Sequence, residues 1–254
     1  CALPIYFSGT YNIDTSDANA SSGLDISLAL NQFKLEVFEP FVSRVFSSIA
    51  PRSSASGNLH LTGTLKAPVL TGKVLVQKAG FTIGYLNTKY TFTNEFVFTK
   101  DEISFNNLTL NDMKGNTGLV SGRINHENFH NIAFDIKIKQ NNLHSLNTRA
   151  VDNNYYYGQA YGSGDIHISG PLGAMDIVVN STSGVGTQVN IPLSNSEELA
   201  SNAYVVFING KDTNDYENVT ANNKKEEIGM PQVKINLEVS DNAKVQLIFD
   251  EMIG

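Results

Sequence analysis

Several features are scarce in this sequence of 254 residues, and each scarcity excludes a class of protein. A single cysteine, Cys1, rules out a disulfide within the chain. Charged residues make up only 17%, and the formal net charge of −7 argues against a nucleic-acid-binding surface, which is basic. No apolar run is long enough to span a bilayer as a helix. What remains is a chain whose 41% of hydrophobic residues can bury a substantial core.

The first residue, Cys1, bears on how the chain is made. The sequence does not start with methionine, so we expect a processed product or a piece of a longer protein. Lipidation of Cys1 after removal of a signal peptide is the less favoured reading, because strand-like sequence follows without a flexible tether. If the parent protein is anchored in a membrane, we expect the anchor to lie outside this segment.

Alternation of apolar and polar residues dominates the chain. Period-2 alternation is typical of β-strands, and strands that are apolar on one side belong to antiparallel or mixed sheets. The sequence therefore predicts an all-β fold. The clearest apolar faces are Leu24, Ile26, Leu28 and Leu30; Ile132, Phe134, Ile136 and Ile138; Val233, Ile235, Leu237 and Val239; and Val245, Leu247 and Phe249.

Helical periodicity is confined to two short stretches. "FEPFVSRVFSSI" has apolar residues at helical spacing, with Pro40 suited to a first turn, and predicts a helix near Pro40–Ala50. "SNSEELASN" offers serine caps followed by acids and predicts a helix at Ser196–Ser201. The polar stretch 209–229 is expected to be a disordered insert.

Two strand-rich units recur in the same order. "FSGTYNI", "LDISLALNQFKL" and "SGNLHLTGTL" fall within residues 7–65, and "VSGRINH", "IAFDIKIKQNNL" and "SGDIHISGPL" fall within residues 120–172. Glycines mark the places where short strands turn, and prolines stop the strand ladders. The sequence therefore contains two copies of one strand-rich unit, with loops of different length.

The stretch "HENFH", from His126 to His130, matches the zinc-protease pattern H-E-x-x-H. That chemistry needs both histidines on one face of a helix. Here the pentapeptide lies between two strand-like stretches, so we interpret it as a solvated loop and predict no metal site and no cofactor. His60 and His167 occupy equivalent positions in the two units, and we expect both on an exposed face. "YYYGQAYGSG" is interpreted as strand-edge packing rather than as a platform for sugars.

The order of these motifs resembles the TamB family, within the wider AsmA-like superfamily. Ser56 to Val74 fits the repeat G-x-L-x-L-x-G-[ST]-L-x-x-P-x-L-x-G-x-[LIV] at nearly every position, and Ser163 to Val179 fits it with Met175 in place of proline. "IPLSNSEELASNAYVVFING" and "SDNAKVQLIFDEMIG" resemble the C-terminal conserved region of TamB-like proteins from Bacteroidetes-type bacteria. Both the divergent second repeat and the polar insert depart from the family's pattern.

The resemblance implies a piece of a long, non-enzymatic protein of the Gram-negative periplasm. Such proteins are anchored at the inner membrane, here outside this segment, and work with a BamA-like or TamA-type partner in the outer membrane. The implied fold is the β-taco, a curved sheet folded around a hydrophobic groove, of which residues 1–254 would form one elongated segment with one or two short inserted helices. The implied ligand is phospholipid, which would pass along the groove.

Three functions remain open at this point. The first is a lipid conduit whose floor is formed by the apolar faces above, with Phe81, Ile83, Phe96, Phe98, Ile103 and Phe105 as further candidates. The second is a chaperone or scaffold that pairs its strand edges with outer-membrane client strands. The third is a surface glycan-binding β-solenoid, ranked last because no repeated cluster of acids and aromatics is evident. A packed sandwich core would show the same alternation. Exposed edges of an excised piece should also favour self-association.

Overall fold

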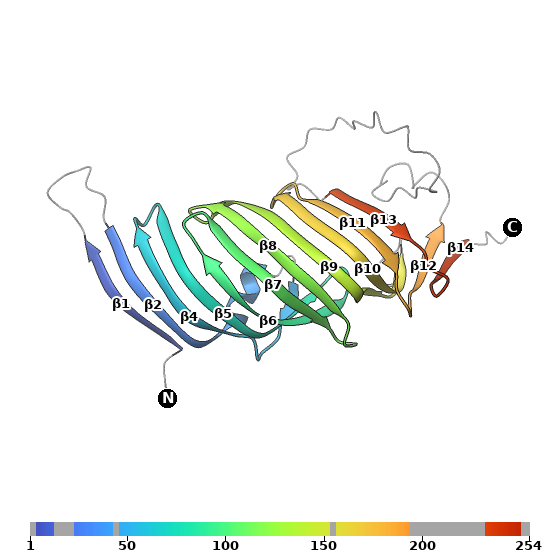
Figure 1. Ribbon diagram of the computed structural model, residues 1–254, viewed down its shortest axis with the longest axis horizontal. Coiled ribbons are helices and arrows are strands. Elements are labelled where there is room, and N and C mark those ends of the chain that lie inside the picture. The colour runs from blue at the N-terminus through green and yellow to red at the C-terminus, as the bar shows by residue number, and fades with distance from the viewer. Residues whose placement is uncertain (1–3, 13–22, 43–45, 153–155, 194–231, 250–254) are drawn as a thin grey trace, which may run out of the picture.

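The protein is almost entirely β-structure, and the computed structural model describes residues 4–12, 23–42, 46–152, 156–193 and 232–249 (Figure 1). A 3-10 turn at Leu35–Phe38 and the four-residue α1 (Glu39–Val42) interrupt the strands. The strands are β1 (Ile5–Asn12), β2 (Gly23–Lys34), β3 (Phe46–Ile49), β4 (Ser54–Gly63), β5 (Pro68–Ile83), β6 (Thr88–Phe98), β7 (Glu102–Asp112), β8 (Thr117–Glu127), β9 (His130–Thr148), β10 (Tyr157–Pro171), β11 (Asp176–Ser183), β12 (Gln188–Leu193), β13 (Gln232–Glu238) and β14 (Lys244–Phe249).

These strands form one 14-stranded sheet in the order β1-β2-β4-β5-β6-β7-β8-β9-β10-β11-β13, with β3 paired to β5 and β12 paired to both β10 and β14. Pairing is antiparallel except for β11 with β13 and β12 with β14, which are parallel. The strands stand side by side across the long axis of the molecule (Figure 1). The prediction of an all-β, elongated and curved sheet is confirmed.

The helix predicted near Pro40–Ala50 is only partly correct. Helical backbone runs over Leu35–Val42, but Phe46–Ile49 is strand β3. Its register sets Phe46 opposite Ile83 and Ile49 opposite Phe81. Pairing with the end of β5 therefore overrides the helical spacing of these residues, as tertiary context often does. The helix predicted at Ser196–Ser201 and the polar insert at 209–229 lie outside the described residues.

Long strands are bent by β-bulges, in which two residues of one strand oppose a single residue of its neighbour. At each of four bulges in the described chain, the second residue has a positive φ near 50°. The backbone N–H of that residue donates to a hydroxyl of the opposing residue. The four donor–acceptor pairs are Gln32 to Ser56 (3.0 Å), Lys78 to Thr93 (3.0 Å), Asn107 to Ser121 (3.1 Å) and Asn142 to Ser163 (2.9 Å).

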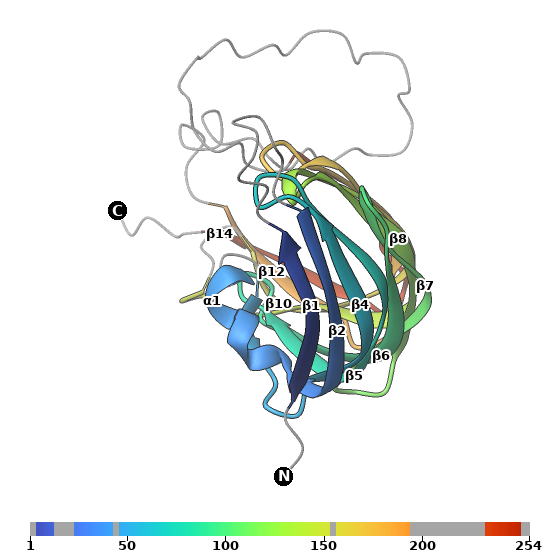
Figure 2. The ribbon, with the colours of Figure 1, turned by 90° about the vertical axis from the view of Figure 1, so that its left-hand side faces the viewer.

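The bent sheet folds back on itself near its middle (Figure 2). Strands β6 and β9 are three positions apart, which in a flat sheet would separate them by about 14 Å. Nevertheless, the Tyr90 hydroxyl of β6 donates to the His144 carbonyl of β9 at 2.6 Å, and the Asn147 N–H donates to the Leu86 carbonyl at 2.9 Å. Because Tyr90 lies on the apolar face of β6, that face is the concave one, and we call it the trough.

Candidate functional site: an apolar trough

Rows of apolar side chains run along the trough, perpendicular to the strands. In each row, every residue is the direct register partner of the next, so the side chains lie on one face at cross-strand contact distance. One row spans β1 to β9: Phe7, Leu28, Leu59, Gly72, Phe98, Ile103, Ile124 and Phe134. Two rows span β7 to β13: Phe105, Gly122, Ile136, Ile168, Ile177 and Val233; and Leu108, Val120, Ile138, Ile166, Val179 and Ile235.

The groove residues expected from the sequence differ widely in how accessible they are. Leu24 and Phe105 are buried, and the side chain of Phe249 is outside the described set. Twelve are partly buried: Ile26, Leu28, Leu30, Phe81, Ile83, Phe96, Phe98, Ile103, Ile132, Phe134, Ile136 and Ile138. The remaining six, at the C-terminal end of the sheet, are exposed: Val233, Ile235, Leu237, Val239, Val245 and Leu247. Whether lipid touches any of them stays a prediction.

The centre of the trough is filled by a cluster that the sequence argument missed. Its buried members are Tyr90, Phe105, Leu108, Leu110, Val120 and Leu143, of which only Phe105 was a candidate. Leu143 was not predicted to lie in the trough, because the bulge at Asn142 shifts the alternation of apolar residues that runs through Ile132–Ile138. The signal for this shift was present, since asparagine tolerates positive φ better than most residues and "NQF", "NNL" and "NNL" recur at three of the bulges.

A polar network secures the place where β9 folds over the trough. The buried Asp112 carboxylate accepts N–H groups from Lys114 (2.7 Å), Asn116 (2.9 Å) and His144 (3.0 Å), and the Asn116 side-chain amide at 2.9 Å. Burial alone would raise the pKa of Asp112, but these hydrogen bonds outweigh it and lower the pKa overall. The carboxylate therefore ties the β7–β8 turn to β9.

Burial also changes the titration of two neighbours of this network. It raises the pKa of the Tyr90 phenol to about 12 and lowers the pKa of the His144 imidazole. His144 stacks on Tyr161 with ring centroids 4.6 Å apart, and its Nε2 has no hydrogen-bond partner within the described chain. Both groups are therefore held in their neutral forms as parts of a packed core. Stacking of Tyr161 agrees with the packing role expected for the "YYYGQAYGSG" stretch.

The opposite, polar face repeats one histidine–aspartate hydrogen bond in both strand units. His60 Nε2 lies 2.6 Å from Asp25, and His167 Nε2 lies 2.9 Å from Asp135, which Arg123 also contacts at 3.0 Å. The hydrogen bond from His167, followed by that from Arg123, lowers the pKa of the Asp135 carboxyl. Both histidines are on the polar face, as predicted.

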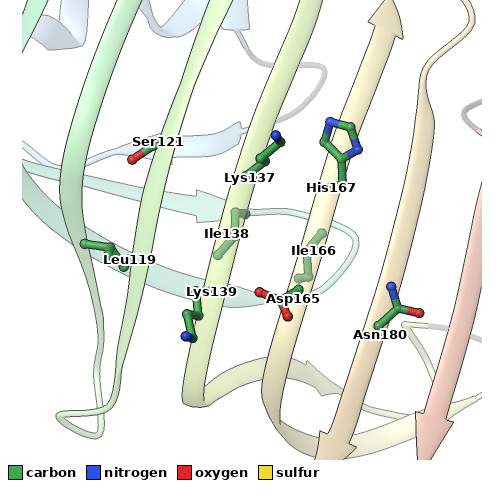
Figure 3. A pocket seen from close by; sticks show the side chains of 9 residues that line it. All are labelled: Leu119, Ser121, Lys137, Ile138, Lys139, Asp165, Ile166, His167 and Asn180. Atoms are coloured by element: carbon green, nitrogen blue, oxygen red, sulfur yellow. The ribbon is translucent and has the colours of Figure 1, made fainter.

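A shallow depression of about 410 Å³ lies beside His167 (Figure 3). Its lining is Leu119, Ser121, Lys137, Ile138, Lys139, Asp165, Ile166, His167 and Asn180. Sugar-binding sites stack the ring on an aromatic side chain, yet this lining contains no Phe, Tyr or Trp. The depression therefore does not favour the glycan-binding alternative.

The "HENFH" stretch forms the hairpin between β8 and β9 and is not helical, but the predicted loop is only partly correct. His126 and Glu127 end β8 and His130 begins β9, so that only Asn128 and Phe129 form the turn. The description of the stretch as solvated is wrong for His126, which is 5% exposed and stacks on Phe129 at 4.6 Å. The ring is buried because Phe129, in the positive-φ turn, folds over it. Within the described residues, no three His, Cys, Asp or Glu side chains gather closely enough to hold a metal ion. In that same part of the chain, no helix has the length and apolarity needed to cross a bilayer.

Comparison with known proteins gives one match. A sequence model of the TamB C-terminal domain matches residues 106–253, which is more than half of the chain. No curated protein and no solved structure matches significantly. The match begins within β7 and covers all later strands, and it includes two of the three apolar rows except for Phe105. The chain therefore belongs to the TamB family, a transport and assembly family of the bacterial envelope that acts in outer-membrane assembly and is not a family of enzymes.

Proposed function

We propose that the trough carries phospholipid acyl chains, and that the segment forms part of a periplasmic path for lipid towards the outer membrane. The observation that carries this proposal is the pair of apolar rows that run from β7 to β13 without a charged residue. The rows run perpendicular to the strands, so beyond the buried central cluster an acyl chain lying along one would cross β9, β10, β11 and β13 without meeting an ion.

The energetic argument needs no catalytic residue. Each buried methylene is worth about 0.8 kcal/mol, so an acyl chain of about sixteen carbons would cost on the order of 10 kcal/mol to expose to water. Partly buried residues such as Ile166 and Val179 offer a continuous dry surface that lowers this barrier. An inner-membrane anchor outside the segment and a BamA-like partner in the outer membrane, both implied by the family, belong to the same proposal.

Site-specific photocrosslinking tests where the lipid lies. A photoreactive side chain placed at Ile235 would point into the trough, whereas one placed at Asn236 would lie on the opposite, polar face of the same strand. Both positions are exposed, so neither replacement overfills a core. With phospholipid vesicles present, we expect lipid adducts at Ile235 and not at Asn236. Equal labelling at both positions, or none at Ile235, would refute the proposal.

A further inference from the structure

Three of the four bulges share a pairing rule. In each of these three, the first strand carries Asn followed by Asn or Gln and then Leu or Phe, and the second strand carries Ser-Gly. The pairs are Asn31-Gln32-Phe33 with Ser56-Gly57, Asn106-Asn107-Leu108 with Ser121-Gly122, and Asn141-Asn142-Leu143 with Ser163-Gly164. In the printed sequence, the three-residue pattern occurs at these places and nowhere else.

The register around each pair is the same. The glycine lies opposite the residue two positions before the bulge donor, as Gly122 lies opposite Phe105. The residue before the serine lies opposite the residue that follows the donor, as Val120 lies opposite Leu108. In every case the Ser-Gly strand is the later one, and the serine accepts from the strand before it. At these three places the Ser-Gly dipeptide thus receives one particular kind of preceding strand, whereas Ser169-Gly170 of β10 faces Asp135 and Phe134 in a regular ladder.

Strand β1 carries the same dipeptide, Ser8-Gly9, at an edge with no preceding strand among the described residues. Gly9 already has the receiving geometry, because a Cβ there would collide with the Asp25 carbonyl of the following strand. The same holds at the glycines of the three complete pairs, which would collide with the carbonyls of Lys73, Asp135 and Asn180. The Ser8 side chain is exposed, and no hydrogen bond to its hydroxyl occurs within the described chain.

Exposed aromatic residues flank this edge on the trough side. Phe7 is 77% exposed and Tyr11 is 42% exposed. The counterpart of Phe7 at the complete β7–β8 pair is Val120, which is 6% exposed and lies opposite Leu108 of the preceding strand. A strand placed on β1 in the same register would set an apolar residue opposite Phe7 and cover it.

We propose that the β1 edge is a docking site for an antiparallel β-strand that carries Asn-(Asn or Gln)-(Leu or Phe) at a bulge. The second residue of that motif would donate its N–H to the Ser8 hydroxyl, and the third would lie opposite Phe7. Recognition would combine a backbone ladder, which any strand can offer, with a bulge that this sequence pattern favours, since asparagine tolerates positive φ better than most residues. The site does not depend on lipid transfer.

The chain supplies its own probe. A labelled peptide with the β7 sequence EISFNNLTLND is titrated with the 254-residue protein, and binding is followed by fluorescence anisotropy. We expect saturable binding that weakens about fivefold in Ser8→Ala, the loss expected for one hydrogen bond. A peptide lacking the residue that corresponds to Asn107 cannot form the bulge, and it should bind the wild-type protein no more tightly than the complete peptide binds Ser8→Ala. Ser27→Ala is the matched control, since Ser27 faces Ser8 from β2, on the side away from the incoming strand.

Four results would overturn the proposal. The first is a peptide that does not bind up to its solubility limit, and the second is binding that neither Ser8→Ala nor the bulge deletion changes. Binding that responds to Ser121→Ala instead of Ser8→Ala would show that the peptide replaces β7 within the sheet. The protein could also dimerise with rising concentration, prevent the peptide from binding, and do so equally well in Ser8→Ala. This result would show that a second copy of the chain pairs with β1 without any need for the bulge. Hydrogen exchange locates the contact, since new protection should appear in β1.

Discussion

The middle and the ends of the sheet carry the same alternating pattern but end up in opposite environments. In the middle, Tyr90 is 4% exposed and Leu143 is 3% exposed. At the ends, Phe7 is 77% exposed and Leu237 is 52% exposed. Hydropathy does not distinguish these positions. What differs is whether another part of the sheet lies over them, as β9 lies over β6 through the contact of Tyr90 with His144.

This difference means that a packed core and an open trough coexist in one sheet. The central cluster around Phe105 and Leu108 behaves as an ordinary interior, in which volume and polarity are both constrained. Towards β13 the same rows become accessible, and there only polarity should matter. Substitutions can therefore separate the two regions by their effects on stability.

The largest effect is expected at the centre. Leu108 is 5% exposed, so Leu108→Asp would bury an unpaired carboxylate, and we expect it to destabilise the protein by more than about 4 kcal/mol. Urea denaturation followed by circular dichroism measures this loss. Leu108→Met, which keeps volume and polarity nearly constant, should cost less than about 1.5 kcal/mol. A stable Leu108→Asp protein would mean that water reaches the centre and that the trough is open throughout.

The second effect concerns the carboxylate that ties β9 over the trough. Asp112→Asn removes the charge and replaces one acceptor oxygen by a donor, and we expect a loss of about 2–3 kcal/mol at neutral pH. The folded-state pKa of Asp112 lies below its ordinary value of 3.8, so the wild-type advantage is complete above that value. It should shrink as the pH falls through the folded-state pKa. Denaturation curves of both proteins at several pH values test this, and a difference that does not change with pH would contradict the role of the charge.

A smaller effect should follow from loss of one bulge acceptor. Ser163→Ala leaves the Asn142 N–H without its 2.9 Å partner at the place where β9 bends, and we expect a cost of about 1 kcal/mol. Ser169→Ala, on the same strand, removes a hydroxyl without a described partner and serves as the control. Equal denaturation midpoints for the two variants would show that the hydroxyl is dispensable for the bend.

The sequence specified a good deal of this fold. Alternation predicted the strands and the sides to which residues such as Ile136 and Ile235 point, because a pleated strand has a strict period of two. It could not predict β3, whose helical spacing yields to pairing with β5. Nor could it predict the exposure of the trough, because a bend at Asn142 changes what lies over Tyr90, some fifty residues away. The recurring Asn-rich motif was the one local sign of those bends.

The smallest effect on stability, and the sharpest on function, is expected at the open end. Ile235 is 45% exposed, so the carboxylate of Ile235→Asp can reach water, and the free energy of unfolding should change by no more than about 0.5 kcal/mol. The same charge would interrupt the row that continues through Val179 and Ile166, where an acyl chain would have to pass it. We therefore expect cells that carry Ile235→Asp in the full-length protein to contain normal amounts of it and yet to lose its support of the outer membrane. Ile235→Met keeps the row apolar and should be silent, as should Gln246→Asp, which places the same charge on the polar face of β14. Full function with Ile235→Asp would remove this end of the trough from the lipid path, whereas loss of the folded protein would assign Ile235 to the closed region that the centre exemplifies.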